Sequence, residues 1–102
     1  MNDNNMLWLQ KWYYKNCNQD WEHDRIVQIG TIDNPGWSVT IQIYDTDLEN
    51  REFQNINYER TEDDWVFCEV KKAKFEGRCG PINLLEILQI FRNWVESEKK
   101  DI

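Results

Sequence analysis

Two segments of the chain carry apolar residues every three or four positions, which is the period of an amphipathic α-helix. The first predicted helix covers residues 5–16, with Asn4 or the next residue as its N-cap. The second covers residues 84–98, with Asn83 and Glu86 spaced to form a capping box at its start. Its apolar stripe is wide and consists of Leu84, Ile87, Leu88, Phe91, Trp94 and Val95.

Between these two segments apolar and polar residues alternate, which is the period of a β-strand with one buried face. The clearest alternation runs over residues 37–44, and its apolar members are Trp37, Val39, Ile41 and Ile43. Further strands are predicted over 25–32, around 56–58 and over 65–72, with a short fifth strand over 73–77.

Asn34-Pro35-Gly36-Trp37 separates the first two predicted strands and fits a type II turn. Proline sets φ at the second position of such a turn, and glycine accepts a positive φ at the third. Successive strands with short connections favour an antiparallel meander of four or five strands, flanked by an N-terminal and a C-terminal helix. The sequence therefore predicts an α+β fold in one domain, residues 1–102, because a second core would be too small to stand alone.

The charge of the chain narrows the class of partner. It has 12 Lys and Arg residues against 19 Asp and Glu residues, which gives a formal net charge of −7. Nucleic acids and anionic membranes attract clustered cations, so this balance argues against both as partners. It favours a basic protein partner, or it serves solubility alone.

Cysteine and histidine are too few for the usual zinc patterns, since the chain has three widely spaced cysteines and one histidine. We expect reduced thiols in a cytoplasmic protein, with no metal site. The first residues lack the cationic start of a signal peptide, and no apolar run approaches the roughly 20 residues that span a bilayer.

Two groups of residues allow an enzymatic interpretation. Asp20, Glu22 and His23 have the residue types of an acid–base cluster, although a polar loop after the first helix is the simpler explanation. Cys79 lies just before the second helix and is either a candidate nucleophile or a spare cysteine in a tight turn. The enzyme hypothesis predicts a depressed pKa for the Cys79 thiol.

Acidic residues gather in two segments between predicted strands. Neither segment has the spacing and central glycine of a calcium-binding loop. They are either solvated turns or a docking surface that raises the association rate of a cationic protein. Their residues are Asp45, Asp47 and Glu49 in the first segment, and Glu59, Glu62, Asp63 and Asp64 in the second.

Several short segments follow one another over most of the chain in a distinctive order. They are Trp8-Leu9-Gln10-Lys11-Trp12-Tyr13, Asp20-Trp21-Glu22-His23, Asp33-Asn34-Pro35-Gly36-Trp37-Ser38-Val39, Asp64-Trp65, Lys74-Phe75-Glu76-Gly77, Gly80-Pro81 and the helix over 84–94. In this order and spacing the chain resembles the immunity protein 53 family of bacterial polymorphic toxin systems.

The resemblance implies an antidote that binds and neutralises a cognate toxin domain, without catalytic activity and without a cofactor. Toxin domains of this kind are often nucleases with cationic clefts, which an acidic surface can block. Trp21 is either packed on the core or an exposed contact, and the resemblance carries it over as a contact. With the acidic residues, the predicted toxin-binding set is Trp21, Glu22, His23, Asp45, Asp47, Glu62, Asp63 and Asp64.

Two other classes of function stay open beside this one. One is a minor enzyme that uses Cys79 or the cluster of Asp20, Glu22 and His23. The other is a small homodimeric ligand-binding module that uses the polar strand face formed by Thr40, Gln42 and Tyr44. The sequence is compatible with a monomer and with a homodimer.

Overall fold

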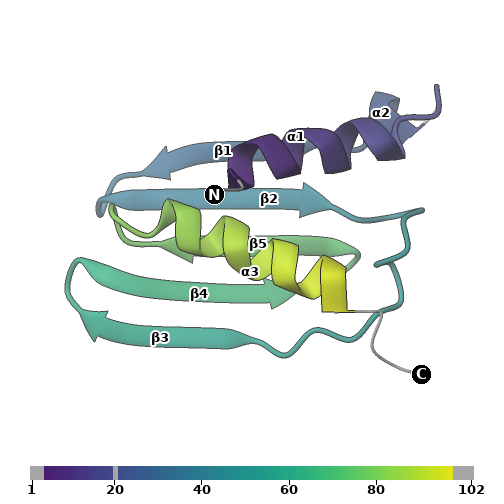
Figure 1. The fold of residues 1–102 in the computed structure, drawn as a ribbon. Helices are drawn as coiled ribbons and strands as arrows, with labels where there is room; N and C mark the ends of the chain where they lie inside the picture. Colours follow the sequence, from purple (N-terminus) through teal and green to yellow (C-terminus); the bar gives the residue numbers. More distant parts are fainter. Residues whose placement is uncertain (1–3, 20, 98–102) are drawn as a thin grey trace.

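A computed structural model describes residues 4–19 and 21–97. The fold has two layers, a five-stranded antiparallel sheet and the helices α1 and α3, which lie across one face of it (Figure 1). In chain order the elements are α1 (Asn5–Asn16), α2 (Trp21–Asp24), β1 (Val27–Ile32), β2 (Gly36–Gln42), β3 (Ile56–Thr61), β4 (Asp64–Val70), β5 (Lys74–Cys79) and α3 (Leu84–Glu96). The predicted α+β class is confirmed.

The strands lie in the order β1-β2-β5-β4-β3, and each neighbouring pair is antiparallel. A meander of successive strands would place β3 beside β2, but β5 takes that position. The inward side chains of Phe75 and Cys79 on β5 are completely buried, as expected for a central strand with a helix above it. Residues 43–55 therefore carry the chain from β2 to the far edge of the sheet (Figure 1).

The two long helices begin where the sequence predicts, but only α1 is capped as expected. Oδ1 of Asn4 accepts hydrogen bonds from the amides of Met6 and Leu7, at 2.8 and 3.1 Å. Asn83 holds the N-cap position of α3, but its side chain makes no cap hydrogen bond. The predicted capping box is therefore wrong, because the Asn83 side chain bonds to Asp64 and Trp65 of β4 and donates to the carboxylate of Glu86, without capping a backbone amide of the helix.

The end of α3 also differs from the sequence prediction. The helix ends at Glu96 with Ser97 as its C-cap, and the predicted last residue, Glu98, lies outside the described residues. The Ser97 hydroxyl donates to the carbonyl of Trp94, which satisfies one of the last carbonyls of the helix.

The turn between β1 and β2 is not of type II. The Asn34–Pro35 peptide bond is cis, as in a type VI turn, and Gly36 does not have the positive φ of a type II turn. Gly36 is needed for space rather than for its conformation. A Cβ atom there would lie 2.1 Å from the carbonyl oxygen of Cys79 on the neighbouring strand.

The core between the helices and the sheet is built largely from aromatic rings. Phe91 of α3 is at its centre and makes edge-on or tilted contacts with Trp12 and Phe75, both at 5.1 Å between ring centroids, and with Trp94 at 6.2 Å. Such contacts add about 0.5–1.5 kcal/mol per pair to the burial of the rings. The predicted alternation of the second strand is confirmed for Val39 and Ile41, which are buried, whereas Trp37 is only partly buried. The strand ends at Gln42, so the buried Ile43 lies just beyond it.

Candidate protein-binding site

The predicted contact residues lie at two opposite ends of the sheet. Trp21, Glu22 and His23 on α2 lie at the end where β1 begins and β2 stops, together with the loop of residues 43–55 (Figure 1). We call this the α2 end. Residues 62–64 form the turn from β3 to β4 at the other end, where β5 runs into α3. We call this the turn end. The predicted toxin-binding residues therefore belong to two separate surfaces and not to one.

Trp21 belongs to the core and not to the surface. Its side chain is 3% exposed and packs edge-on against Trp12, with ring centroids 6.0 Å apart. Its indole N–H donates to the carbonyl of Tyr44 at 2.9 Å, which ties α2 to the chain just after β2. A partner cannot contact this side chain while α2 stays in place, so its assignment as a contact is corrected to a structural anchor.

The carboxylate of Glu22 is used by its own segment. It accepts a hydrogen bond from the amide of Asn18 at 2.9 Å. Hydrogen bonds from backbone amides, first its own and then those of Asn18 and Gln19, hold the pKa of Glu22 below its usual value. His23 is exposed, and Asp20 of the proposed acid–base cluster lies outside the described residues. The cluster therefore has no shared pocket among the residues that the structure describes.

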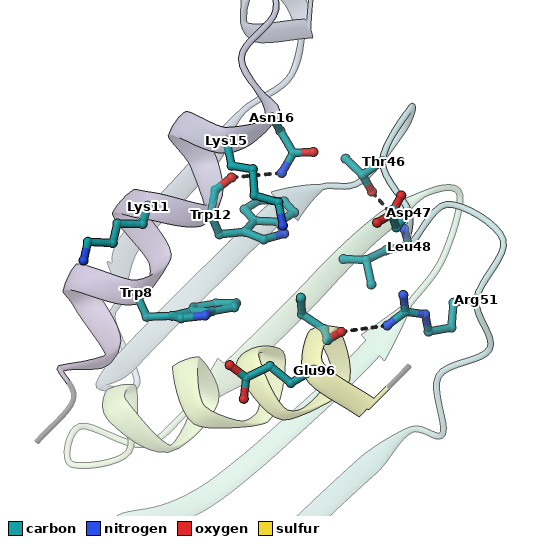
Figure 2. A pocket seen from close by; sticks show the side chains of 11 residues that line it. Trp8, Lys11, Trp12, Lys15, Asn16, Thr46, Asp47, Leu48, Arg51 and Glu96 are labelled. Carbon is teal, nitrogen blue, oxygen red and sulfur yellow. Dashed lines mark hydrogen bonds between the residues drawn. The ribbon is translucent and has the colours of Figure 1, made fainter. Parts of the chain in front are cut away.

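The acidic residues of the 43–55 loop lie beside cations. Asp45 forms an ion pair with Arg25 at 3.1 Å. Asp47 lines a pocket of about 420 Å³ between α1, this loop and the last turn of α3, and it shares that pocket with Lys11 and Lys15 (Figure 2). The α2 end thus presents both signs of charge, which weakens its attraction for a cationic partner.

Arg51, which lines the same pocket, joins the 43–55 loop to the end of α3. Its guanidinium donates to the carbonyl oxygens of Trp94 and Val95, at 2.8 and 3.0 Å. These carbonyls belong to the last turn of α3, where a cation is favourable. The indole of Trp94 donates in return to the carbonyl of Glu52 at 2.9 Å. The loop and the helix end therefore hold each other in place.

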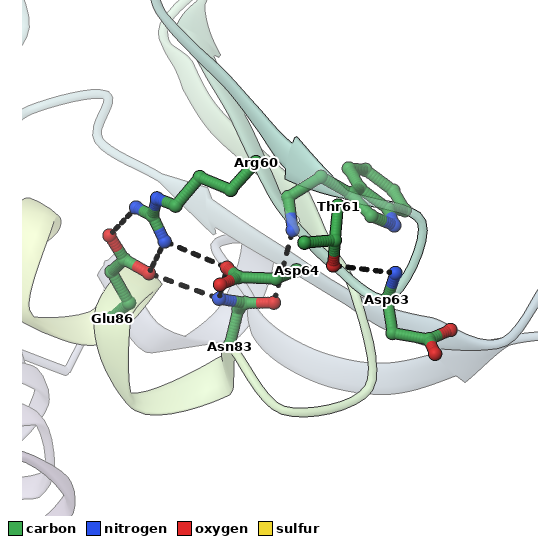
Figure 3. Close-up of polar contacts among 7 residues, drawn as sticks. Arg60, Thr61, Asp63, Asp64, Asn83 and Glu86 are labelled. Carbon is green, nitrogen blue, oxygen red and sulfur yellow. Dashed lines mark hydrogen bonds and ion pairs between the residues drawn. The ribbon is translucent and has the colours of Figure 1, made fainter.

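At the turn end, Asp64 is part of a polar network that joins β3, β4 and α3 (Figure 3). Arg60 pairs with Asp64 at 2.8 Å and also with Glu86. Asn83 is 4% exposed; its amide donates to Asp64 at 2.9 Å, and its oxygen accepts from the backbone amide of Trp65. The hydrogen bond from Asn83, followed by the influence of Arg60, lowers the pKa of Asp64 below its usual value.

Glu62 and Asp63 differ from Glu22, Asp45 and Asp64, whose carboxylates are engaged within the protein. Both are exposed, and among the described residues neither carboxylate has an ion pair or hydrogen bond. Only the backbone amide of Asp63 is engaged, by the hydroxyl of Thr61 at 3.3 Å (Figure 3). The turn therefore presents two adjacent unneutralised carboxylates to solvent.

Two exposed apolar side chains at the turn end were missed by the sequence analysis. Ile82 is 73% exposed and Leu85 is 62% exposed. Ile82 lies in the connection from β5 to α3, and Leu85 lies in the first turn of α3. This connection passes close to the acidic turn, as a Cβ atom on Gly80 would lie only 2.4 Å from the carbonyl oxygen of Asp63. The available signal was the position of Leu85 outside the apolar stripe of its helix, which predicts an outward side chain.

Comparison of the chain with protein-family models shows the family to which it belongs. The model described as immunity protein 53 matches residues 6–96, from the first turn of α1 to the end of α3. The chain belongs to the immunity protein 53 family. No curated protein and no solved structure matches the chain. Membership of this immunity protein family indicates an antitoxin role, with a toxin as the general class of partner.

The thiols of this immunity protein do not have the properties that the enzyme hypothesis requires. Cys79 is completely buried, and burial raises its pKa, where a nucleophile needs a depressed pKa. Burial also raises the pKa of Cys68 to about 12. Cys79 lies at the turn end and His23 at the α2 end, so no described histidine can serve as its base. The predicted depressed pKa of Cys79 is wrong.

The described residues also bear on metal binding and on membrane insertion. Within residues 4–19 and 21–97, no group of three or more His, Cys, Asp and Glu side chains is arranged to hold a metal ion. In the same part of the chain, no helix has the length and apolar character needed to cross a membrane.

Proposed function

We propose that this protein neutralises the toxin domain of a cognate polymorphic toxin by binding it, without catalysis and without a cofactor. The toxin surface that it covers is basic, as in the substrate cleft of a nuclease. The contact is made by the turn end, with Glu62 and Asp63 as its charged residues and Ile82 and Leu85 as its apolar residues.

The observation that carries this proposal is the pair of unneutralised carboxylates in a chain of net charge −7. Asp45 and Glu22 are engaged within the protein, and Asp47 lines a pocket that Lys11 and Lys15 also line. A cationic partner is therefore attracted most strongly toward Glu62 and Asp63. His23 is exposed but lies at the other end, so we exclude it from the proposed contact.

Ile82 and Leu85 supply what charge alone does not. Exposed charges mainly speed the encounter, whereas apolar side chains that become buried slow dissociation. Ile82 lies in the connection from β5 to α3 and Leu85 in the first turn of α3, and Gly80 in the same connection approaches Asp63 of the acidic turn. An apolar centre beside a charged rim is the usual anatomy of a protein interface.

The first test of the proposed function is co-expression with the toxin domain encoded next to this gene. We expect host cells to survive only when the immunity protein is present, and both chains to elute together after purification. Survival without co-elution would contradict neutralisation by binding. If a demonstrably toxic domain is neither bound nor neutralised, the proposed pairing is wrong.

The second test separates the two ends of the sheet. The double variant Glu62→Gln with Asp63→Asn should lower the association rate with the toxin domain about tenfold at low ionic strength, because it removes the steering charges. The matched control is Asp45→Asn with Asp47→Asn, which removes the same formal charge from the α2 end. Equal slowing by the two double variants would show that only net charge matters and would remove the turn end as the contact.

A further inference from the structure

The sheet has two edge strands, and only one of them is protected against pairing. Edge strands usually carry charges or bulges that keep another strand from adding to them. β3 carries Glu59 and Arg60, and its register with β4 shifts between Glu59 and Thr61. Arg60 is also held by Glu86 of α3. This edge therefore has the usual protective features.

The other edge, β1, has none of these features. No charged residue and no proline occurs from Ile26 to Ile32. Its register with β2 is continuous, from Val27 opposite Ile41 to Ile32 opposite Gly36. A regular, uncharged strand at a sheet edge is a template for another strand.

The backbone of β1 presents a regular row of hydrogen-bonding groups on its open side. The amide of Gln42 donates to the carbonyl of Ile26 at 3.0 Å, so the even-numbered residues of this edge face β2. Since antiparallel pairing alternates, the amides and carbonyls of Val27, Ile29 and Thr31 face outward. In the part of the chain that the structure describes, β2 is the only strand paired with β1.

Apolar side chains surround this row. A groove of about 800 Å³ lies between α1 and β1, on the helix side of the sheet edge. Met6 and Leu7 line it and are 46% and 47% exposed, and Ile26 at its end is 44% exposed. The side chains of a strand added to β1 that point toward the helices would enter this groove.

We propose that β1 pairs antiparallel with β1 of a second copy of this chain, across a twofold axis at Ile29. The two sheets then form one continuous sheet. In this register Val27 lies opposite Thr31 of the second copy, and Gln28 lies opposite Gly30. Val27 and Ile29 of each copy turn toward the groove of the other.

The absence of charge along β1 indicates that its pairing partner is a second copy of this chain. In a twofold contact a residue near the axis meets its own copy or a close neighbour, so charges of one sign there would repel, and two chains of net charge −7 meet most readily over a neutral segment. From Ile26 to Ile32 every cross-strand pair in this register is uncharged. The first charged positions beyond it are opposite in sign, since Arg25 lies opposite Asp33 of the second copy.

Sedimentation velocity of the purified protein without toxin tests the proposal. We expect a dimer whose dissociation constant rises at least tenfold in Gln28→Glu, because each copy then adds a negative charge to the pairing edge. Asn57→Glu is the matched control, since Asn57 is an exposed polar residue on the same sheet face of the opposite edge strand. This control should leave the dissociation constant unchanged. A monomer at all concentrations, or a dimer that Gln28→Glu leaves intact, would overturn the proposal.

Disulfide cross-linking between two cysteine variants tests the proposed register of the two β1 strands. Both variants also carry Cys17→Ser, which removes the partly exposed native thiol. Gln28→Cys mixed with Gly30→Cys should cross-link, because non-hydrogen-bonded partners have Cα atoms about 4.5 Å apart. Space is open around Gly30 for the new side chain. Gln28→Cys alone should not cross-link, because the two copies of position 28 would be about 7–8 Å apart. Equal cross-linking in both samples would reject the register.

The dependence on ionic strength distinguishes the proposed dimer from the proposed binding of a toxin domain. Higher ionic strength should strengthen the dimer, because it screens the repulsion between two acidic chains, whereas it should slow association with a basic toxin domain. If β1 is instead reserved for the toxin, the protein alone is a monomer and Gln28→Glu weakens only toxin binding. That result would overturn the dimer and leave the antidote role intact.

Discussion

The two ends of the sheet differ in how many of their predicted contact carboxylates are engaged within the protein. At the α2 end, Glu22 and Asp45 hold backbone and arginine groups of the same chain in place. At the turn end, Asp64 does the same, but Glu62 and Asp63 next to it do not. Runs of like charge in a sequence therefore do not form one functional class, since neighbouring carboxylates can have structural and exposed roles.

The lengths of the two connections explain this difference. Residues 43–55 form a long segment without a strand, so side chains such as Arg51 must hold it against the helices. The turn from β3 to β4 has only Glu62 and Asp63 between the paired residues Thr61 and Asp64. The strand ladder holds so short a turn in place, and the carboxylates of Glu62 and Asp63 stay exposed.

The largest expected effect on stability lies at the α2 end. Trp21→Ala should lower the free energy of unfolding by about 3–5 kcal/mol, since it leaves a cavity beside Trp12 and removes the hydrogen bond to Tyr44. Ile82→Ala at the turn end should change it by less than about 0.5 kcal/mol, because Ile82 is exposed. Urea unfolding of both variants provides the measurement. A loss below about 1 kcal/mol for Trp21→Ala would contradict its role as an anchor.

An intermediate effect is expected from the structural part of the turn end. Asn83→Ala should cost about 1–3 kcal/mol, because it leaves the partly buried amide of Trp65 without its partner and removes one of the two side-chain donors to Asp64. Asn93→Ala is the control, since Asn93 is an exposed asparagine on the same helix. Thermal or urea unfolding compares the two variants. If both variants lost the same free energy of unfolding, the hydrogen bonds of the Asn83 side chain would contribute nothing to stability beyond the helix propensity of the residue.

The smallest expected effect is a change in the acid dependence of stability. The pKa of Asp64 is lower in the folded protein than its usual value of 3.8, so its contribution is fully present above that value. The contribution is lost as the pH falls through the folded pKa, because protonation then weakens the bonds to Asn83 and Arg60. Asp64→Asn should flatten this part of the stability–pH curve, and Asp63→Asn should leave it unchanged. Urea titrations between neutral and acidic pH measure both curves.

Local pattern was sufficient for most of the secondary structure. Residues 5–16 form a helix as predicted, since the apolar period and the Asn4 cap both act within a few residues. The four-residue helix α2 was not predicted, because it is too short to show a period. The central place of β5 was also missed, since it depends on pairing with β2, more than 30 positions earlier in the chain. Sequence spacing carries no record of such distant pairs.

The candidate site was harder to predict than the fold. Trp21 sits among charged residues in the sequence, and only the packing of α2 onto α1 shows that it is buried. Glu62 and Asp64 look alike in the sequence, but only Asp64 faces Arg60 and Asn83. The exposure of Ile82 follows from where α3 begins. Each of these differences arises from tertiary contacts rather than from local composition.

The central position of β5 has a consequence for how the protein becomes active. β1 with β2, and β3 with β4, form two hairpins that meet only through β5, which is made after both. Isolated hairpins are at best marginally stable in water, so a nascent chain that lacks residues 74–79 has no stable sheet. We expect folding to wait for non-local pairing and then to proceed in one cooperative step. Protection of the cell would then depend on the number of completed chains, because a truncated chain would give no partial immunity.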